Sequence, residues 1–297
     1  MNARMQKRMH QAQTGLRNLA SARTDPSTFL MTGRYPNLTS FEYDLSGPAI
    51  PFAVEPALQS QLQRLQDILR QARSTPLDGN RPLQIALVSG GPGTGKSSLA
   101  PWMAYQAEVH LYRLSASELV GLTAKSACQS LAFLFRQAID HAPAILLLDD
   151  LQALETAFPQ AESREIVHGE LFRQMQALDG KPVLLLLATR CPERLGAEWF
   201  QPGRIETQVE LNLPDSLTRL AILRQHTRSL RLAFDVNLIS LARSAPGLSG
   251  ADLAELCRQA DLRAAAQHRQ RVNMADFQAA LERYLLDHAD TRLADEV

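Results

Sequence analysis

The sequence predicts an α/β fold, in which helices cover both faces of a parallel β-sheet and a smaller all-helical domain follows. Between residues 83 and 213, five short apolar or β-rich runs alternate with helical patterns, which is typical of a parallel sheet. The first, third and fourth runs are continuously apolar, as expected for strands buried on both faces. From about Leu213 the pattern becomes wholly helical, and this change predicts a domain boundary.

Residues 1–49 predict a basic arm or linker with little core of its own, because they mix charged residues with Thr, Ser, Pro and Gly. No acid occurs in this stretch before Asp25. A solvated tail, an organellar transit peptide and a nucleic-acid-binding arm are the alternatives for it. From Glu55 to Ala72 the leucines recur at helical spacing and predict an amphipathic helix. These leucines are Leu58, Leu62, Leu65 and Leu69.

The elements divide into two domains after the arm. We expect the α/β domain over residues 50–213 and an α-helical domain over residues 214–297. The strands are expected at 83–89, 109–116, 144–150, 183–189 and 207–213. The helices of the second domain are expected at 215–230, 235–245, 249–267 and 273–287.

Composition excludes few partners but favours a chain without a membrane span. Of the 297 residues 45% are hydrophobic, and 31 basic residues balance 31 acidic ones, so net charge gives no support for nucleic acid or an anionic membrane. The three cysteines show no zinc-ligand or CxxC spacing, which favours a reducing cytoplasmic compartment. No run reaches the roughly 18 apolar residues of a membrane helix.

The glycine-rich stretch "GGPGTGKSS", residues 90–98, lies between the first strand and the next helix and satisfies GxxxxGK[ST]. Its backbone amides would surround phosphate oxygens, Lys96 would reach the outer phosphates, and the Ser97 hydroxyl would bind Mg²⁺. The sequence therefore predicts an ATP and Mg²⁺ site. The nucleotide-binding residues predicted here are Gly91, Pro92, Gly93, Thr94, Gly95, Lys96, Ser97 and Ser98.

Two acids end the apolar run "ILLLDD". In phosphate-loop proteins an acid at the end of a neighbouring strand holds the metal, so Asp149 is the expected Mg²⁺ partner together with Ser97. Asp150 is the expected residue that orients the attacking water. A helix cap for the following residues is the alternative role for Asp149.

Further motifs together resemble the AAA ATPases, a branch of the AAA+ superfamily that includes the ATPase modules of bacterial proteases. They are "REIVHGELFRQMQALDG", "LLATRCPERL", "QPGRIE", "APGLSGADLAELCRQA" and "VNMADFQAAL". The resemblance covers roughly residues 44–287 and implies strand order 5-1-4-3-2, a helical lid, and a homo-hexamer or other ring. It also implies that Arg204 is a catalytic arginine finger for a neighbouring subunit, and that Gly250 and Ala251, with residues 44–47, line the adenine pocket.

Several positions depart from the family pattern. Asp150 stands where Glu is usual, and Arg190 replaces the Asn that senses the γ-phosphate. Arg190 could contact phosphate itself or pair with Asp149 or Asp150, and the sequence leaves both alternatives open. Gln201 replaces a second finger arginine, and Lys181 replaces the Phe of a "DGF" motif.

The segment expected to grip a threaded polypeptide also differs, because "LTAK" (residues 122–125) lacks an aromatic residue. An HExxH protease motif is absent from the sequence, so we do not expect this chain to degrade proteins by itself.

These observations predict an ATPase that hydrolyses ATP slowly and remodels or assembles an unidentified protein partner. Catalysis would rest on Asp150, Lys96 and Arg204, with Arg190 near the phosphates. The first alternative is a nucleotide-gated structural or regulatory ring in which hydrolysis is vestigial. The second is a DNA-linked AAA+ ATPase, in which the arm contacts phosphates.

Overall fold

The computed structural model of the chain describes residues 52–53, 56–74 and 84–294. The five expected strands form one sheet in the order β2-β3-β4-β1-β5, and every neighbouring pair is parallel. Read from the other edge this is 5-1-4-3-2, so the predicted topology is confirmed. The strands are β1 (Gln84–Gly90), β2 (His110–Ser115), β3 (Ala144–Asp149), β4 (Val183–Thr189) and β5 (Thr207–Leu211).

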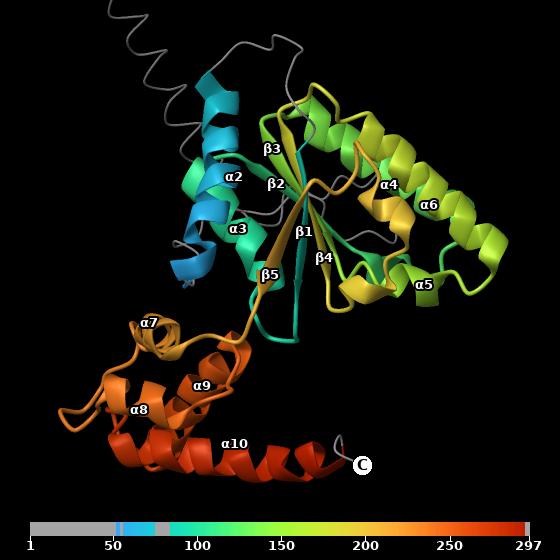
Figure 1. Cartoon of the computed structure of the whole chain (residues 1–297). Helices are drawn as coiled ribbons and strands as arrows, with labels where there is room; N and C mark the ends of the chain where they lie inside the picture. Colours follow the sequence, from blue (N-terminus) through green and yellow to red (C-terminus); the bar gives the residue numbers. More distant parts are fainter. Residues whose placement is uncertain (1–51, 54–55, 75–83, 295–297) are drawn as a thin grey trace, which may run out of the picture. The chain divides into compact units, whose positions relative to one another are not determined.

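Helices cover both faces of this sheet, with α2 and α3 on one face and α4, α5 and α6 on the other (Figure 1). They are α2 (Pro56–Ser74), α3 (Lys96–Ala107), α4 (Ala124–Asp140), α5 (Ala153–Ala157) and α6 (Ala161–Gln176). Short 3-10 turns are η1 (Ala116–Leu119), η2 (Pro192–Arg194) and η3 (Ala197–Phe200).

Burial on both faces explains the continuous apolarity of the central strands. In β3, Ile145 and Leu147 belong to the core cluster that includes α2 and α3, whereas Leu146 and Leu148 alternate with them and are buried too. All residues of β3 and β4 are buried. The apolar runs that predicted these strands therefore reflect a sheet with two covered faces.

The sheet topology gathers three loop regions at one edge, because parallel strands all end on the same side. The phosphate loop follows β1, the paired acids stand at the end of β3, and Arg190 directly follows β4. Strand β4 lies between β1 and β3, so these three strand ends are consecutive in the sheet. Residues 90–98, 149–150 and 190, separate in sequence, thus share one edge.

After β5 the chain is helical, with α7 (Ser216–His226), α8 (Leu238–Ser244), α9 (Gly250–Ala266) and α10 (Met274–Ala294). These helices share a core that includes Leu223, Leu241, Leu253 and Phe277. The Arg219 guanidinium is buried and donates to the carbonyls of Ala242 and Pro214, both at 2.8 Å. The predicted helical lid is confirmed.

Two further predictions concern the N-terminal arm and membrane-spanning helices. The basic arm predicted for residues 1–49 lies outside the described residues. Within the described ranges, none of the helices combines the length and apolarity needed to cross a bilayer.

Candidate functional site

The phosphate loop connects β1 directly to α3. Gly93 has a φ of 71° and Gly95 a φ of 101°, a backbone region that favours glycine. A Cβ atom on Gly93 would lie 2.3 Å from Ser249 Oγ, so glycine is also required sterically. The loop conformation predicted from the motif is therefore supported by backbone geometry and by packing.

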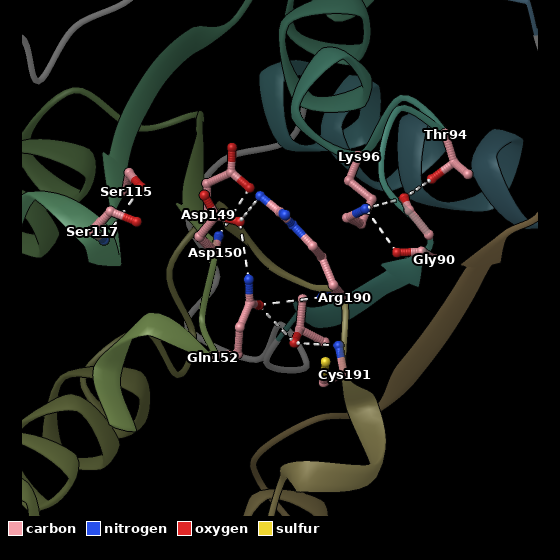
Figure 2. Close-up of polar contacts among 12 residues, drawn as sticks. Gly90, Thr94, Lys96, Ser115, Ser117, Asp149, Asp150, Gln152, Arg190 and Cys191 are labelled. Atoms are coloured by element: carbon pink, nitrogen blue, oxygen red, sulfur yellow. Dashed lines mark hydrogen bonds and ion pairs between the residues drawn. The ribbon is translucent and has the colours of Figure 1, made fainter. Parts of the chain in front are cut away.

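Lys96 is the first residue of α3 and its ammonium group points back into the loop (Figure 2). Its Nζ donates to the carbonyl oxygens of Gly90 at 2.8 Å and Gly91 at 2.6 Å. Burial lowers the pKa of Lys96 below its ordinary value, and the nearby Arg190 guanidinium adds to this shift. Asp149 and Asp150 oppose the shift by favouring the charged ammonium.

The remaining loop residues lie as an anion cradle requires. Thr94 Oγ1 donates to Gly91 O at 2.9 Å, which closes the turn of the loop. Gly91 and Pro92 are exposed, and so are Ser97 and Ser98 in the first turn of α3. The helix N-terminus and its hydroxyls are therefore accessible to a phosphate group.

Asp149, the last residue of β3, is only 3% exposed and carries a strong ion pair. Its Oδ2 accepts from Nη2 of Arg113 at 2.8 Å, and its Oδ1 accepts from the backbone N–H of Asp150 at 2.9 Å. Arg113 lies on the adjacent strand β2, two residues before the position that pairs with Asp149. Sequence reasoning missed Arg113, although a cation inside a mostly apolar strand beside the acids was the available signal.

Asp150 and Arg190 form the second ion pair of the site. Arg190 Nη2 lies 3.3 Å from Asp150 Oδ1, so Arg190 pairs with an acid in this structure. Its predicted contact with phosphate stays a prediction. The backbone of Asp150 has a φ of 52°, an uncommon conformation for a residue with a side chain. The Arg190 side chain extends from the end of β4 toward the paired acids (Figure 2).

Gln152 links these groups, although no sequence motif singles it out. Its Nε2 donates to Asp150 Oδ1 at 3.0 Å. Its Oε1 accepts from Thr189 Oγ1 at 3.0 Å and from the backbone N–H of Arg190 at 3.2 Å. Gln152 therefore ties the acid after β3 to the end of β4 (Figure 2).

The lid contacts the phosphate loop through the start of α9. The backbone N–H of Ala251 donates to Gly93 O at 3.2 Å. A hollow beside this contact has mostly apolar residues in its lining and includes Gly250. The adenine pocket stays a prediction. Its lining residues are Phe52, Ala53, Leu58, Leu62, Thr94, Leu211, Asn212, Pro214, Thr218, Ile222 and Gly250. Ala251 is not among these lining residues, and the predicted contribution of residues 44–47 lies outside the described residues.

Arg204 lies in an aromatic cluster, distant in sequence from the phosphate loop. Its guanidinium carbon is 3.7 Å from the centroid of the Phe172 ring, and Nη1 donates to the Glu198 carbonyl. Phe172 in turn packs edge-on against buried Trp199, with centroids 4.9 Å apart. Cation–π contact and the carbonyl therefore hold the predicted arginine finger against α6 of its own subunit.

His168 belongs to the same cluster, where its ring lies edge-on to Phe172 and Trp199. Its ring packs on Trp199 with centroids 5.6 Å apart. Burial lowers the pKa of His168 below 6.5 and outweighs the opposing effect of Glu155, whose carboxylate is 3.8 Å from Nε2. The folded chain therefore binds this proton less readily than the unfolded chain.

We expect the His168 contribution to stability to be complete above about pH 6.5 and to be lost as pH falls through the lower folded pKa. The free energy of unfolding of the parent should fall between pH 7.5 and pH 5.5. In His168→Gln this fall should be smaller by about 1 kcal/mol. Chemical denaturation at the two pH values measures this difference. His110→Gln is the control, because His110 is exposed. An equal loss of stability at acid pH in His168→Gln and the parent would contradict the expectation.

The other departures from the family pattern lie at the surface. Thr123 caps α4 by accepting from the Ser126 N–H at 3.2 Å, and Lys125 is exposed in the first turn of that helix. Lys181 and Gln201 are also exposed. Thr123 therefore has a structural role that does not depend on a threaded polypeptide.

The donors present suit a magnesium ion. Ser97 offers an exposed hydroxyl and Asp149 a carboxylate, and Mg²⁺ uses few protein oxygens beside water and substrate phosphates. The same carboxylate also holds the Arg113 guanidinium. A metal ion at Asp149 would therefore share its ligand with a cation of the chain.

Comparison with known proteins agrees with this geometry. Residues 86–213 match the family described as "ATPase family associated with various cellular activities (AAA)", and residues 235–279 match the AAA+ lid domain. The chain is 36% identical over 247 residues to "ATP-dependent zinc metalloprotease FtsH" of Syntrophus aciditrophicus, covering 78% of this chain and 33% of that protein.

A protein of the same name from Acaryochloris marina is 39% identical over 234 residues, which cover 76% of this chain and 36% of that protein. The chain thus spans about a third of the length of the curated relatives it matches. Together with the sheet order and the phosphate loop, these matches show that the chain belongs to the AAA ATPases and comprises an AAA domain followed by an AAA+ lid.

Proposed function

We propose that this chain binds ATP with Mg²⁺ and hydrolyses it slowly in order to remodel or assemble a protein partner. The observation that supports this most directly is the meeting of the phosphate loop, Lys96 and the paired acids at one sheet edge. Membership of the AAA family supports the same proposal.

ATP would bind with its phosphates on the loop of residues 90–98 and its base in the apolar hollow that includes Phe52 and Gly250. Lys96 would exchange its contacts with the Gly90 and Gly91 carbonyls for contacts with phosphate oxygens. The exchange replaces two neutral acceptors by an anion, and charge-assisted hydrogen bonds are the stronger kind.

Hydrolysis would proceed by in-line attack of water on the γ-phosphate. Asp150 would orient this water, and Lys96 would stabilise the charge that develops on the phosphate. Arg204 of a neighbouring subunit would add a second cation, after leaving its contact with Phe172. A magnesium ion held by Ser97 and Asp149 would supply further charge neutralisation when bound.

Two features of Asp150 support a slow reaction. Its side chain is one methylene shorter than Glu, and a displacement of about 1 Å can lower a rate by about 10²-fold. Gln152 and Arg190 also both contact Oδ1. These contacts hold the Asp150 carboxylate in place, which would hinder it from orienting the attacking water.

A homo-oligomeric ring is part of the proposal, because an arginine finger acts on the γ-phosphate bound by a neighbouring subunit. The named relatives are ATP-dependent proteases. For this chain we propose only that ATP-driven movement of the lid, which contacts Gly93, acts on a protein partner.

A second candidate function is a nucleotide-gated ring whose hydrolysis is vestigial. The two ion pairs favour it, because Arg113 engages Asp149 and Arg190 engages Asp150. In this case ATP binding alone would order the ring.

Phosphate release from the parent and from Asp150→Asn separates the two candidates. An active ATPase should lose about 10²-fold in turnover in the variant, because the water loses its orienting carboxylate. Asp261→Asn, an exposed change in the lid, is the matched control. Equal rates in Asp150→Asn and the parent, with ATP binding intact, would favour the gated ring instead.

A further inference from the structure

Arg113 brings a permanent cation to the acid that is expected to serve the metal. Its contact with Asp149 Oδ2 is short, at 2.8 Å, while the Asp149 side chain is only 4% exposed. The Arg113 side chain remains 40% exposed, so the ion pair joins a partly exposed cation to a buried acid.

The arginines change the charge of the whole site. With Arg113 and Arg190 the site has three cations, because Lys96 is the third. Against the carboxylates of Asp149 and Asp150 this leaves a formal charge of +1. Without the two arginines, one cation would face two carboxylates and the formal charge would be −1.

This balance matters because ATP without metal is a polyanion. A site of negative charge binds it well only when a divalent cation neutralises both the phosphates and the acids. When arginines of the chain already neutralise the acids of the site, the metal ion adds less to the affinity for ATP. Arg113 contributes most to this, because it contacts the more deeply buried carboxylate.

We propose that Arg113 is a specificity-determining residue that makes nucleotide binding by this chain largely independent of Mg²⁺. Its guanidinium takes over, at Asp149, the charge neutralisation that a metal ion otherwise supplies, and it competes with the ion for the same carboxylate. The proposal rests on the proposed nucleotide binding and concerns affinity alone.

The test is an equilibrium titration with the β,γ-imido analogue of ATP, by calorimetry, in excess Mg²⁺ and in excess EDTA at equal ionic strength. For the parent chain we expect the two dissociation constants to agree within about threefold, since loss of the metal leaves a site of positive charge. A parent affinity more than about tenfold weaker in EDTA would overturn the proposal by itself.

Arg113→Gln provides the second arm. Glutamine can still donate a hydrogen bond to Asp149 but carries no charge, so the buried acid keeps a partner. We expect the ratio of the dissociation constants in EDTA and Mg²⁺ to rise about tenfold, and Arg113→Lys, which keeps the charge, to retain the parent ratio. An unchanged ratio in a folded Arg113→Gln chain would contradict the proposal.

Arg136→Gln is the matched control, because it removes an exposed arginine that pairs with Asp140 on α4, outside the site. Its ratio should equal that of the parent. If the analogue binds the parent neither in Mg²⁺ nor in EDTA, the proposed function itself fails. If it binds in both Mg²⁺ and EDTA in a Lys96-dependent manner, the ratios decide on Arg113 alone.

Discussion

Replacing Lys96 with alanine should weaken ATP binding by about 10- to 100-fold, because a charge-assisted contact with the outer phosphates is lost. Lys96 is buried at the start of α3, and the loop carbonyls already orient its ammonium group. Turnover should fall further, by about another 10²-fold, since the same cation stabilises the developing charge. Calorimetric titration with ATP and a phosphate-release assay measure the two effects separately.

Lys125→Ala is the control for this experiment, because Lys125 is an exposed lysine of α4 and not part of the phosphate loop. Its affinity and rate should match those of the parent. Unaltered ATP affinity in a folded Lys96→Ala chain would exclude the nucleotide site proposed above. The folded state of each variant can be checked from its thermal unfolding transition.

Replacing Arg204 with alanine should lower turnover by about 10³-fold while leaving ATP affinity nearly unchanged, as expected for a finger that acts on a neighbour's γ-phosphate. In the described chain Arg204 contacts Phe172 and the carbonyl of Glu198, and the proposed catalytic role has it act on a neighbouring subunit instead. Steady-state phosphate release, with a parallel titration of ATP, separates rate from affinity. Arg194→Ala, an exposed change in η2, is the matched control.

Mixing variants tests whether Arg204 acts in trans. Arg204→Ala subunits retain an intact phosphate loop, and Lys96→Ala subunits retain the finger. A mixture should therefore recover part of the parent activity, because some interfaces combine an intact loop with an intact finger. Recovery would be absent if Arg204 acted only within its own subunit, and equal turnover in Arg204→Ala and the parent would exclude a catalytic role.

The fold was predictable because each of its signals is local. Continuous apolar runs predicted β3 and β4, and the structure confirms them with burial of every residue in both strands. The GxxxxGK[ST] motif similarly predicted a loop between β1 and α3, where glycine is required by a positive φ and by close packing. The sheet order followed from resemblance to a family, because strand periodicity alone does not give the order of strands.

The candidate site was predictable only in part. The sequence alone indicated the phosphate loop, Lys96 and the two acids, since each lies within a short motif. It left open whether Arg190 meets phosphate or an acid, because that depends on where the end of β4 lies relative to β3. The Arg204→Ala variant and the mixing experiment test the predicted role of Arg204.

The sequence by itself determined the chemical groups of this protein: a phosphate-binding loop, a strand ending in two acids, and a helical lid. Only the tertiary structure decided their pairing, because sheet neighbours are far apart in the chain. Strand β2 brings Arg113 onto Asp149, and the end of β4 brings Arg190 onto Asp150. Ion pairs depend on distances of a few ångström, which spacing along a sequence does not specify.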